Sequence, residues 1–431
     1  MNVANPKIKT SFLNLILALA IIIASSVAFL NDLSYVRKSC SADLKQRIAA
    51  ARHLMQGYDP YFFKEKIGKS KEVLIPNWVT ITPSGLIIFY SMAKLPYWLI
   101  RYIWFVLSWL LLLGSIQMFA RSAGSDDKSK LIWFVSLFFI CSSYAFRIHM
   151  ERGQVYIIYL FLLSAAYWFL QRKFIGNIIG SGFIIGFLAT LRPTMVLMCI
   201  PILIYKRWKV FIGSIAGITF GVALSAVVAG IPIWKSYFVA LKEINGFEST
   251  RQYIGNPVYK YAYQLEGMYN DMSKFKIVKN PPGYISDSSL NRILHYSVSS
   301  QTIFFMFILV ILTAIILLII QRYFVQNISN SLIFLIGIGL VLLGDTFIPH
   351  PKFSYYDVMW LVPLSLIIIS VDSLSFLIRP STLILLLSLF FSIPFVGAVK
   401  GVLFAECMML FYLPIIITIF LKRDLRNQNT R

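Results

Sequence analysis

The stretch SADLKQRIAAARHLMQGYDPY, residues 41–61, is the one around which the rest of the chain is organised. It follows an apolar segment, residues 11–30, that is long enough to cross a membrane and too long for the core of a signal peptide. Within the stretch, apolar side chains recur at helical spacing between basic ones, at Leu44, Ile48, Ala51 and Met55. Ser41 is suited to begin this helix and Gly57 to end it. The pattern predicts an amphipathic helix just outside the membrane, able to lie on the bilayer surface.

Asp43 falls in the first turn of this predicted helix. Carboxylates are favoured at helix N-termini because the helix dipole attracts them, and taken alone this structural explanation is the more common one. The same position would also suit a catalytic base at the boundary between water and lipid. The residue type and its place in the helix leave both interpretations open.

The composition indicates a polytopic membrane protein. Of 431 residues, 58% are hydrophobic and only 13% are charged, which is more apolar surface than a soluble domain can bury. A net charge of +22 would suggest a nucleic-acid partner in a soluble chain, but here the cations stand mostly in loops and at segment ends, beside lipid headgroups. The four cysteines are scattered and show no disulfide framework or metal-binding spacing.

Apolar segments separated by short basic loops predict an all-α bundle of about twelve transmembrane helices with both termini in the cytoplasm. Residues 1–431 form a single membrane-embedded domain in this interpretation, with long external loops at 31–82 and 232–300. The apolar piece 84–95 is too short to span and predicts a re-entrant or interfacial helix. No phosphate-binding glycine motif and no sizeable cytoplasmic domain are visible, so we expect the chemistry at the outer face.

Four groups of ionisable residues are predicted at the outer membrane edge. They are Asp43 with Asp59, the cluster at 147–154, Arg192 at the break before Pro193, and the stretch from Asp345 to Asp357. Each has a structural explanation, because cations at span ends extend to headgroups and tyrosines gather at the interface. Ionisable groups at membrane depth are costly, however, so four such groups on one side of a bundle indicate function. Together they offer a carboxylate, guanidinium groups and an imidazole, a set suited to deprotonating a hydroxyl while binding a phosphate.

Residues 41–61 resemble the first external loop of glycosyltransferase family 87, the polyprenol-phosphate-sugar-dependent mannosyltransferases of the GT-C type. In that loop an Asp is followed by small residues and then by Gly-x-Asp-Pro-Tyr, which corresponds here to Asp43 and residues 57–61. Later segments resemble the family's short Pro-led helix, its Gly-Gln-led span, its Gly-rich helix with a basic-Pro break, and its late apolar run. These segments are residues 81–112, 152–163, 176–209 and 352–366.

The resemblance implies a GT-C-like fold in which Asp43 is the general base. It also implies cations around the phosphate of the donor, for which the candidates are Arg147, Arg152, Arg192, His350 and Lys352. The family's phosphate-binding His would fall where this chain has Tyr356 and Asp357, and His350 lies a few residues upstream. Further substrate contacts are expected from Asp59, Tyr61, His149, Glu151, Gln154, Tyr356 and Asp357.

The implied donor is a polyprenyl-phosphate-linked sugar, mannose or another hexose, and the implied acceptor is a lipid or a glycan. The chemistry admits a divalent cation without demanding one, and no metal ligands are assigned. We expect a multi-pass protein of a bacterial inner (plasma) membrane, with its site on the periplasmic or extracellular side and no nucleic-acid partner. A transporter or flippase of lipid-linked or glycan substrates is the alternative, although it would more naturally show inverted repeats. A scaffold of a cell-envelope complex is a third option, and it would not need Asp43.

Overall fold

The computed structural model describes residues 6–38, 42–67, 71–76, 81–172, 174–250, 298–325, 328–347, 354–371 and 398–429. Within these ranges, fifteen α-helices, three short 3₁₀ segments and one two-stranded antiparallel hairpin make up the regular structure. The expected all-α architecture is therefore confirmed, and the hairpin is an addition that the sequence patterns did not predict.

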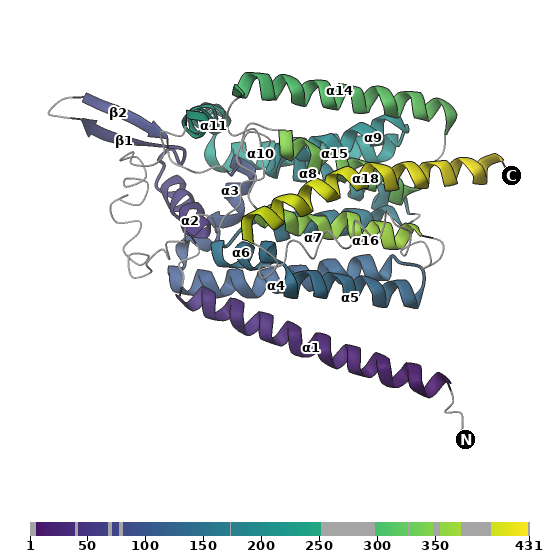
Figure 1. Ribbon diagram of the computed structural model, residues 1–431. Helices are drawn as coiled ribbons and strands as arrows, with labels where there is room; N and C mark the ends of the chain where they lie inside the picture. The colour runs from purple at the N-terminus through teal and green to yellow at the C-terminus, as the bar shows by residue number, and fades with distance from the viewer. Residues whose placement is uncertain are drawn as a thin grey trace.

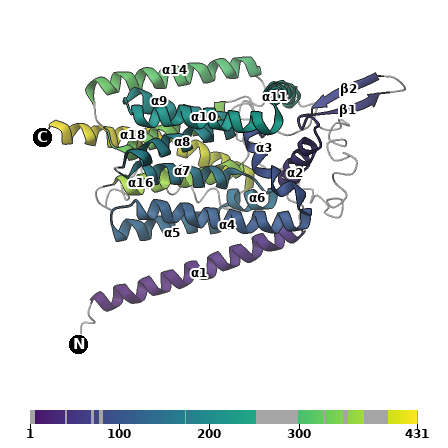
Figure 2. The same cartoon turned by 180° about the vertical axis from the view of Figure 1, so that it is seen from behind.

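The longer helices form one bundle, as Figures 1 and 2 show from opposite sides. They are α1 (Pro6–Lys38), α4 (Tyr97–Arg121), α5 (Asp126–Ser142), α7 (Tyr156–Leu170), α8 (Ile175–Leu191), α10 (Trp208–Ala229), α14 (Ser300–Phe324), α15 (Asn330–Phe347), α16 (Leu361–Ser370) and α18 (Ala398–Asn429). The two ends of the chain lie at the same end of the bundle, on the right of Figure 1. The opposite end, which we call the loop end, carries the shorter elements that follow α1.

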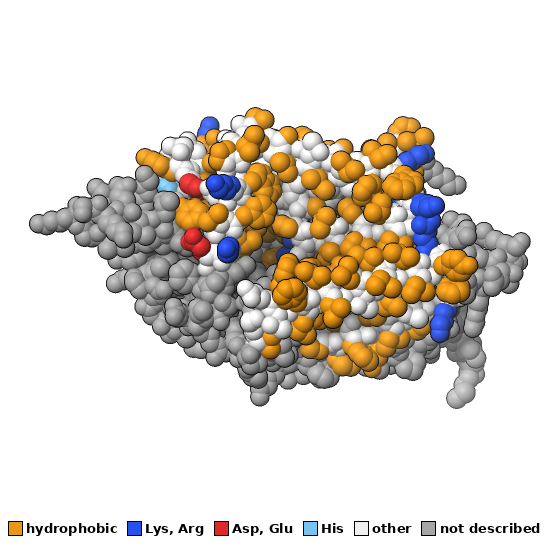
Figure 3. All heavy atoms as spheres, turned by 90° about the horizontal axis from the view of Figure 1, so that it is seen from above, with side chains coloured by type: hydrophobic (Ala, Val, Ile, Leu, Met, Phe, Trp, Pro, Cys, Tyr) orange, Lys and Arg blue, Asp and Glu red, His pale blue; other side chains and the backbone are white. Residues whose placement is uncertain are grey.

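Five helices in the described part of the chain are long and apolar enough to cross a membrane, within α1, α4, α10, α14 and α15. The bent pair formed by α5 and α6 (Tyr144–Arg152) makes six if it counts as one broken span. Figure 3 shows hydrophobic side chains over the middle of one face, with charged side chains gathered toward its two ends. The chain is thus a multi-pass integral membrane protein. The count of about twelve spans stays a prediction, because the expected span at 381–397 lies outside the described residues.

Helices α8 and α10 pack with their backbones in contact. A Cβ added at Gly182, Gly186, Gly213 or Gly217 would collide with backbone atoms of the facing helix. Membrane helices associate largely through van der Waals packing, and small residues favour it because they let the backbones approach closely. The pair also anchors the loop end, since Ser84 of α3 (Pro83–Tyr90) donates from Oγ to the carbonyl of Gly221 at 2.8 Å.

The loop end is built from α2 (Ala42–Met55), the hairpin, α3, the 3₁₀ segment η1 (Met92–Lys94) and α11 (Pro232–Thr250). The hairpin pairs β1 (Phe62–Ile67) with β2 (Lys71–Pro76), with Phe62 opposite Pro76 and Ile67 opposite Lys71. The short apolar piece that the sequence marked as non-spanning is α3 plus η1. Thr82 caps α3 by accepting from the Gly85 N–H at 3.2 Å, and Pro83 occupies its first turn.

Helix α2 forms where the amphipathic pattern predicts it, but it does not lie free on a surface. It packs against α3, η1 and α6, and Leu44, Ile48 and Ala51 are fully buried. Arg52 fixes its C-terminal end, because the guanidinium donates to the carbonyls of Ala93 and Leu95, each at 3.0 Å. The apolar stripe is therefore covered by protein, and the first turn with Asp43 is brought against the bundle.

Candidate active site at the loop end

Asp43 stands in the first turn of α2 and faces the last residue of α6, Arg152. The Nε of Arg152 donates to Oδ2 of Asp43, and its Nη2 donates to Oδ1, both at 2.7 Å. Two parallel N–H···O bonds of this kind form the strongest geometry for an arginine–carboxylate pair. The side chains are 12% exposed for Asp43 and 24% exposed for Arg152, so solvent or a substrate can reach the pair.

The turn after α6 supplies a further ligand for this carboxylate. Gly153 ends the helix in the left-handed conformation, at φ 66° and ψ 49°, which glycine adopts without strain. The chain then reverses, and the N–H of Gln154 bonds to the carbonyl of His149 at 3.0 Å. The side-chain amide of Gln154 donates from Nε2 to Oδ2 of Asp43. Asp43 thus accepts bonds from both sides of the α6 turn.

Arg47 holds the other end of that amide. It lies one helical turn after Asp43 on α2, and its Nη2 donates to Oε1 of Gln154 at 2.6 Å. Its Nη1 donates to the carbonyl of Gly153 at 2.9 Å. Asp43 and Arg47, four residues apart on α2, therefore both bond to the turn that follows α6. We call Asp43, Arg47, Arg152 and Gln154 the carboxylate cluster.

A second ion pair lies between α8 and α15. Arg192, the residue after α8, reaches Asp345 with an Nη2···Oδ2 distance of 2.8 Å, and the two side chains are only 13% and 6% exposed. Its guanidinium lies over the rings of Tyr156 and Tyr356, at 4.8 and 4.7 Å from their centroids. Its Nε also donates to Thr194 at 3.1 Å. The break before Pro193 that the sequence marked is confirmed, and it places Arg192 beside a carboxylate and two tyrosine rings.

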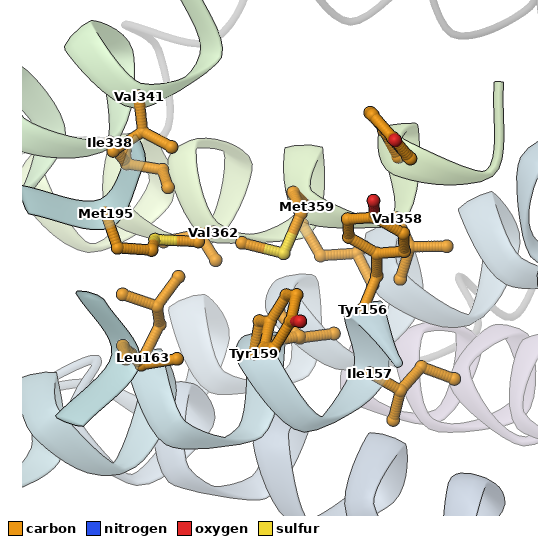
Figure 4. Close-up of a cluster of buried hydrophobic side chains, with 14 of the residues drawn as sticks. Tyr156, Ile157, Tyr159, Leu163, Met195, Ile338, Val341, Val358, Met359 and Val362 are labelled. Carbon is orange, nitrogen blue, oxygen red and sulfur yellow. The ribbon is translucent and has the colours of Figure 1, made fainter. Parts of the chain in front are cut away.

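Tyrosines connect the two ion pairs. The 3₁₀ segment η3 (Ser354–Trp360) packs on α6 and α7, and its Tyr355 is close enough to Asp43 and Arg152 to interact with both charges. The rings of Tyr355 and Tyr356 are 5.0 Å apart, and those of Tyr356 and Tyr156 are 4.3 Å apart. Figure 4 shows Tyr156 and Tyr159 of α7 beside a buried apolar layer that includes Leu163, Met195, Ile338, Met359 and Val362. The tyrosines therefore link the two ion pairs to a layer of buried apolar side chains.

The cluster at 147–154 is divided by the structure. Residues up to Arg152 form α6, at 65° to α5, and only Arg152 and Gln154 contact Asp43 in the bonds described above. His149 is fully buried, and its Nε2 accepts from the Ile157 N–H at 3.2 Å, so it orders the start of α7. Glu151 is also buried. Arg147 lies over the ring of Tyr35 of α1, with 4.3 Å to its centroid, which directs it toward α1.

The remaining predicted residues have other surroundings or lie outside the described ranges. Asp59 is exposed, and its Oδ1 accepts from the Tyr61 N–H at 2.8 Å, as in an Asx turn. Tyr61 is fully buried and donates to the Ile81 carbonyl at 2.9 Å, and burial raises its pKa well above the usual range. Asp357 is buried in η3. His350 and Lys352 lie outside the described residues.

The sequence patterns did not identify three residues that belong to the carboxylate cluster or contact Arg192. Arg47 looked like one of several basic residues on an amphipathic helix, although its spacing of four from Asp43 puts both on one face. Asp345 appeared only as the start of a polar stretch, and nothing marked it as the partner of Arg192. Tyr156 had no signal beyond its place at the start of an apolar helix.

The described residues contain no group of three or more His, Cys, Asp or Glu side chains placed to hold a metal ion. The chemistry that the cluster itself offers is that of a carboxylate between a cation and an amide. Such a carboxylate can take a proton, and the guanidinium can bind an anion.

The family model of glycosyltransferase family 87 matches residues 80–349, well over half of the chain. The chain therefore belongs to glycosyltransferase family 87, and membership implies transfer of a sugar from a donor to an acceptor. The matched range includes Arg152, Gln154, Arg192 and Asp345, while α2 with Asp43 precedes it. No curated protein and no solved structure gave a significant match.

Proposed function

We propose that this member of glycosyltransferase family 87 transfers a sugar, mannose or another hexose, from a polyprenyl-phosphate-linked donor to a lipid or glycan acceptor. In this proposal Asp43 is the general base. The observation that carries it is the Asp43 carboxylate, held at the loop end by Arg152 and Gln154 and still partly exposed. A carboxylate and an anion-binding guanidinium side by side are what this reaction needs.

The transfer would proceed in one displacement step. The acceptor hydroxyl attacks the anomeric carbon of the donor sugar and gives its proton to Asp43. A new bond forms between that carbon and the acceptor oxygen, while the bond from the carbon to the phosphate oxygen breaks and its electron pair leaves with the phosphate. General-base catalysis of this kind contributes about a hundred- to ten-thousand-fold in rate.

Arg152 is the best-placed cation for the leaving phosphate, because it touches the proposed base. Preorganised donors aimed at developing charge supply a large share of catalysis. Arg192 and Arg147 enter the proposal as further cations of the same end, although Asp345 and Tyr35 already engage them. His350 and Lys352 remain candidates for binding the donor phosphate, as the family resemblance suggests.

An outer-face location is supported by the distribution of cations. At the end of the bundle that holds the termini, Lys128 donates to the carbonyls of Ile369 and Val371, and Arg423 donates to that of Ser370. On the face seen in Figure 3, that end carries Lys and Arg but no visible acid. Cytoplasmic ends of membrane proteins are enriched in cations. We therefore place the termini in the cytoplasm and the loop end outside, in a topology of about twelve spans.

The test is sugar transfer by the purified full chain in lipid vesicles. A panel of polyprenyl-phosphate sugars is supplied with candidate lipid and glycan acceptors, and products are identified by mass spectrometry. We expect a new glycosidic bond with at least one donor, and its loss in Asp43→Asn. Movement of an intact lipid-linked sugar between leaflets with no new bond would instead make the protein a flippase.

A further inference from the structure

Most of the hydrogen-bonding capacity of the proposed base is used in the structure. Asp43 accepts three hydrogen bonds, two from Arg152 and one from Gln154. A carboxylate has about four lone-pair sites in all, and those facing the α6 turn are taken. Three of these sites are therefore occupied, and release of Arg152 would free two of them for an acceptor hydroxyl.

The two donors differ in exposure and in charge. Gln154 is 2% exposed, and Arg47 fixes its amide oxygen while also binding the Gly153 carbonyl. Arg152 has a 24% exposed side chain at the end of its helix and carries a full positive charge. A guanidinium fork matches a phosphate as well as it matches a carboxylate, so an incoming phosphate competes for Arg152 and not for Gln154.

We infer that the phosphate of the lipid-linked donor takes Arg152 over from Asp43, and that Gln154, held by Arg47, keeps the carboxylate in place during the exchange. The inference rests on the proposed function. It frees two lone-pair sites of the base for the acceptor once the donor has bound. Gln154 and Arg47 are positioning residues in this scheme, and Arg152 is the group that changes partner. No covalent bond is made or broken in the exchange.

The charges follow the exchange consistently. Before binding, Arg152 and Asp43 neutralise each other across a bidentate pair. After binding, the phosphate neutralises Arg152, and Asp43 keeps one hydrogen bond from a neutral amide. The carboxylate thereby gains the freedom to accept a proton at the moment when the sugar is in place.

A double-mutant cycle on phosphate binding tests the exchange without requiring turnover. The full-length protein, Asp43→Asn, Arg152→Gln and the double variant are reconstituted in phosphatidylcholine vesicles, and binding of sugar-free polyprenyl monophosphate is measured. An amide is a neutral and weaker competitor for Arg152 than a carboxylate, so Asp43→Asn should bind on the order of tenfold more tightly, a difference equal to about 1.4 kcal/mol. The same change made in the Arg152→Gln background should leave binding unaltered, because the shared partner is gone.

Unchanged or weaker binding by Asp43→Asn, or equal tightening in both backgrounds, would overturn the exchange. So would the same coupling with phosphatidylglycerol vesicles lacking polyprenyl phosphate. If Arg152→Gln does not fold, infrared difference spectra of the unaltered protein decide: an Asp43 carboxylate band, identified by its absence in Asp43→Asn, must shift when polyprenyl monophosphate is added. If the unaltered protein transfers sugar from none of the donors, the proposed function is rejected. If it transfers sugar but Asp43 and Arg152 show no coupling in phosphate binding, only the exchange is rejected.

Discussion

The two ion pairs of the loop end use the same chemical groups in different surroundings. Asp43 and Arg152 meet through two bonds of 2.7 Å between α2 and α6, with a side-chain exposure of 12% and 24%. Arg192 and Asp345 meet at 2.8 Å between α8 and α15, with an exposure of 13% and 6%, and the cation lies over two tyrosine rings. The contact distances are nearly equal, so geometry alone does not separate a reactive pair from a structural one.

The surroundings make the difference. Removing one partner of a buried ion pair strongly destabilises the fold, because the remaining charge stays buried without a counter-charge. In the exchange that we propose, the rim pair separates because Arg152 is partly exposed and Gln154 remains as a second donor to Asp43. We therefore propose that the pair at the rim takes part in the chemistry, and that the pair beside the tyrosines contributes mainly to assembly of the bundle.

The largest effect is expected for Asp43→Asn. The substitution keeps the size and most of the hydrogen bonding of the side chain but removes the proton acceptor, so turnover should fall by about a hundred- to ten-thousand-fold. Sugar transfer in vesicles measures the loss, and thermal unfolding in detergent should change little. Near-normal turnover in the folded, membrane-inserted variant would return Asp43 to the role of a helix-terminal charge.

Asp345→Asn should act in the opposite way, on folding more than on chemistry. Removing one partner of a buried pair typically costs about 3–5 kcal/mol. Arg192 would be left over the two tyrosine rings without its counter-charge. The unfolding temperature and the yield of folded protein should fall together. The double variant Arg192→Met with Asp345→Leu should recover much of the loss. If stability is intact and only donor use is lost, Arg192 binds the phosphate and the two pairs have similar roles.

A smaller effect is expected at Gln154. Gln154→Ala removes one hydrogen bond to a charged group, which is worth roughly tenfold in rate, and it should lower kcat more than it raises KM. Arg47→Ala should give a similar loss, and the double variant should lose little more, because both residues act through the same amide. Equal and additive losses in unfolding temperature for the two variants would make the pair merely structural.

Local features of the site could be predicted from the sequence. The helix that carries Asp43 depends on the spacing of its own apolar residues, and α3 depends on the Thr82 cap with Pro83 behind it. The break at Arg192 follows from the proline after it. These elements are specified within a few neighbouring residues, so the pattern and the structure agree.

The pairing of distant groups could not be predicted in the same way. Asp43 and Arg152 are 109 positions apart, and no local pattern says which of 40 basic residues a carboxylate will meet. The sequence contained a signal for the hairpin, because two six-residue runs flank the short segment Gly68-Lys69-Ser70, whose composition is typical of a turn. Its lysines and its place in a long polar loop obscured that signal.

The smallest effect is expected for Asp59→Asn, the matched control for the change at Asp43. Both acids belong to residues 41–61, and both variants exchange a carboxylate for an amide of the same shape. Asp59, however, is exposed and uses its Oδ1 to accept the Tyr61 N–H at 2.8 Å. An asparagine oxygen can accept the same bond, since both residue types favour this kind of turn.

Turnover and unfolding temperature in Asp59→Asn should therefore stay close to those of the unaltered protein, within about the half kcal/mol typical of surface substitutions. The two variants together distinguish a general effect of lost charge from loss of the proposed base. Each removes one negative charge from the same loop, but only Asp43 belongs to the carboxylate cluster. If any charge lost from this loop were enough to stop transfer, both variants would fail alike. If Asp59→Asn alone abolished the chemical step, the base would lie in the turn before Pro60, and Asp43 would be the structural acid.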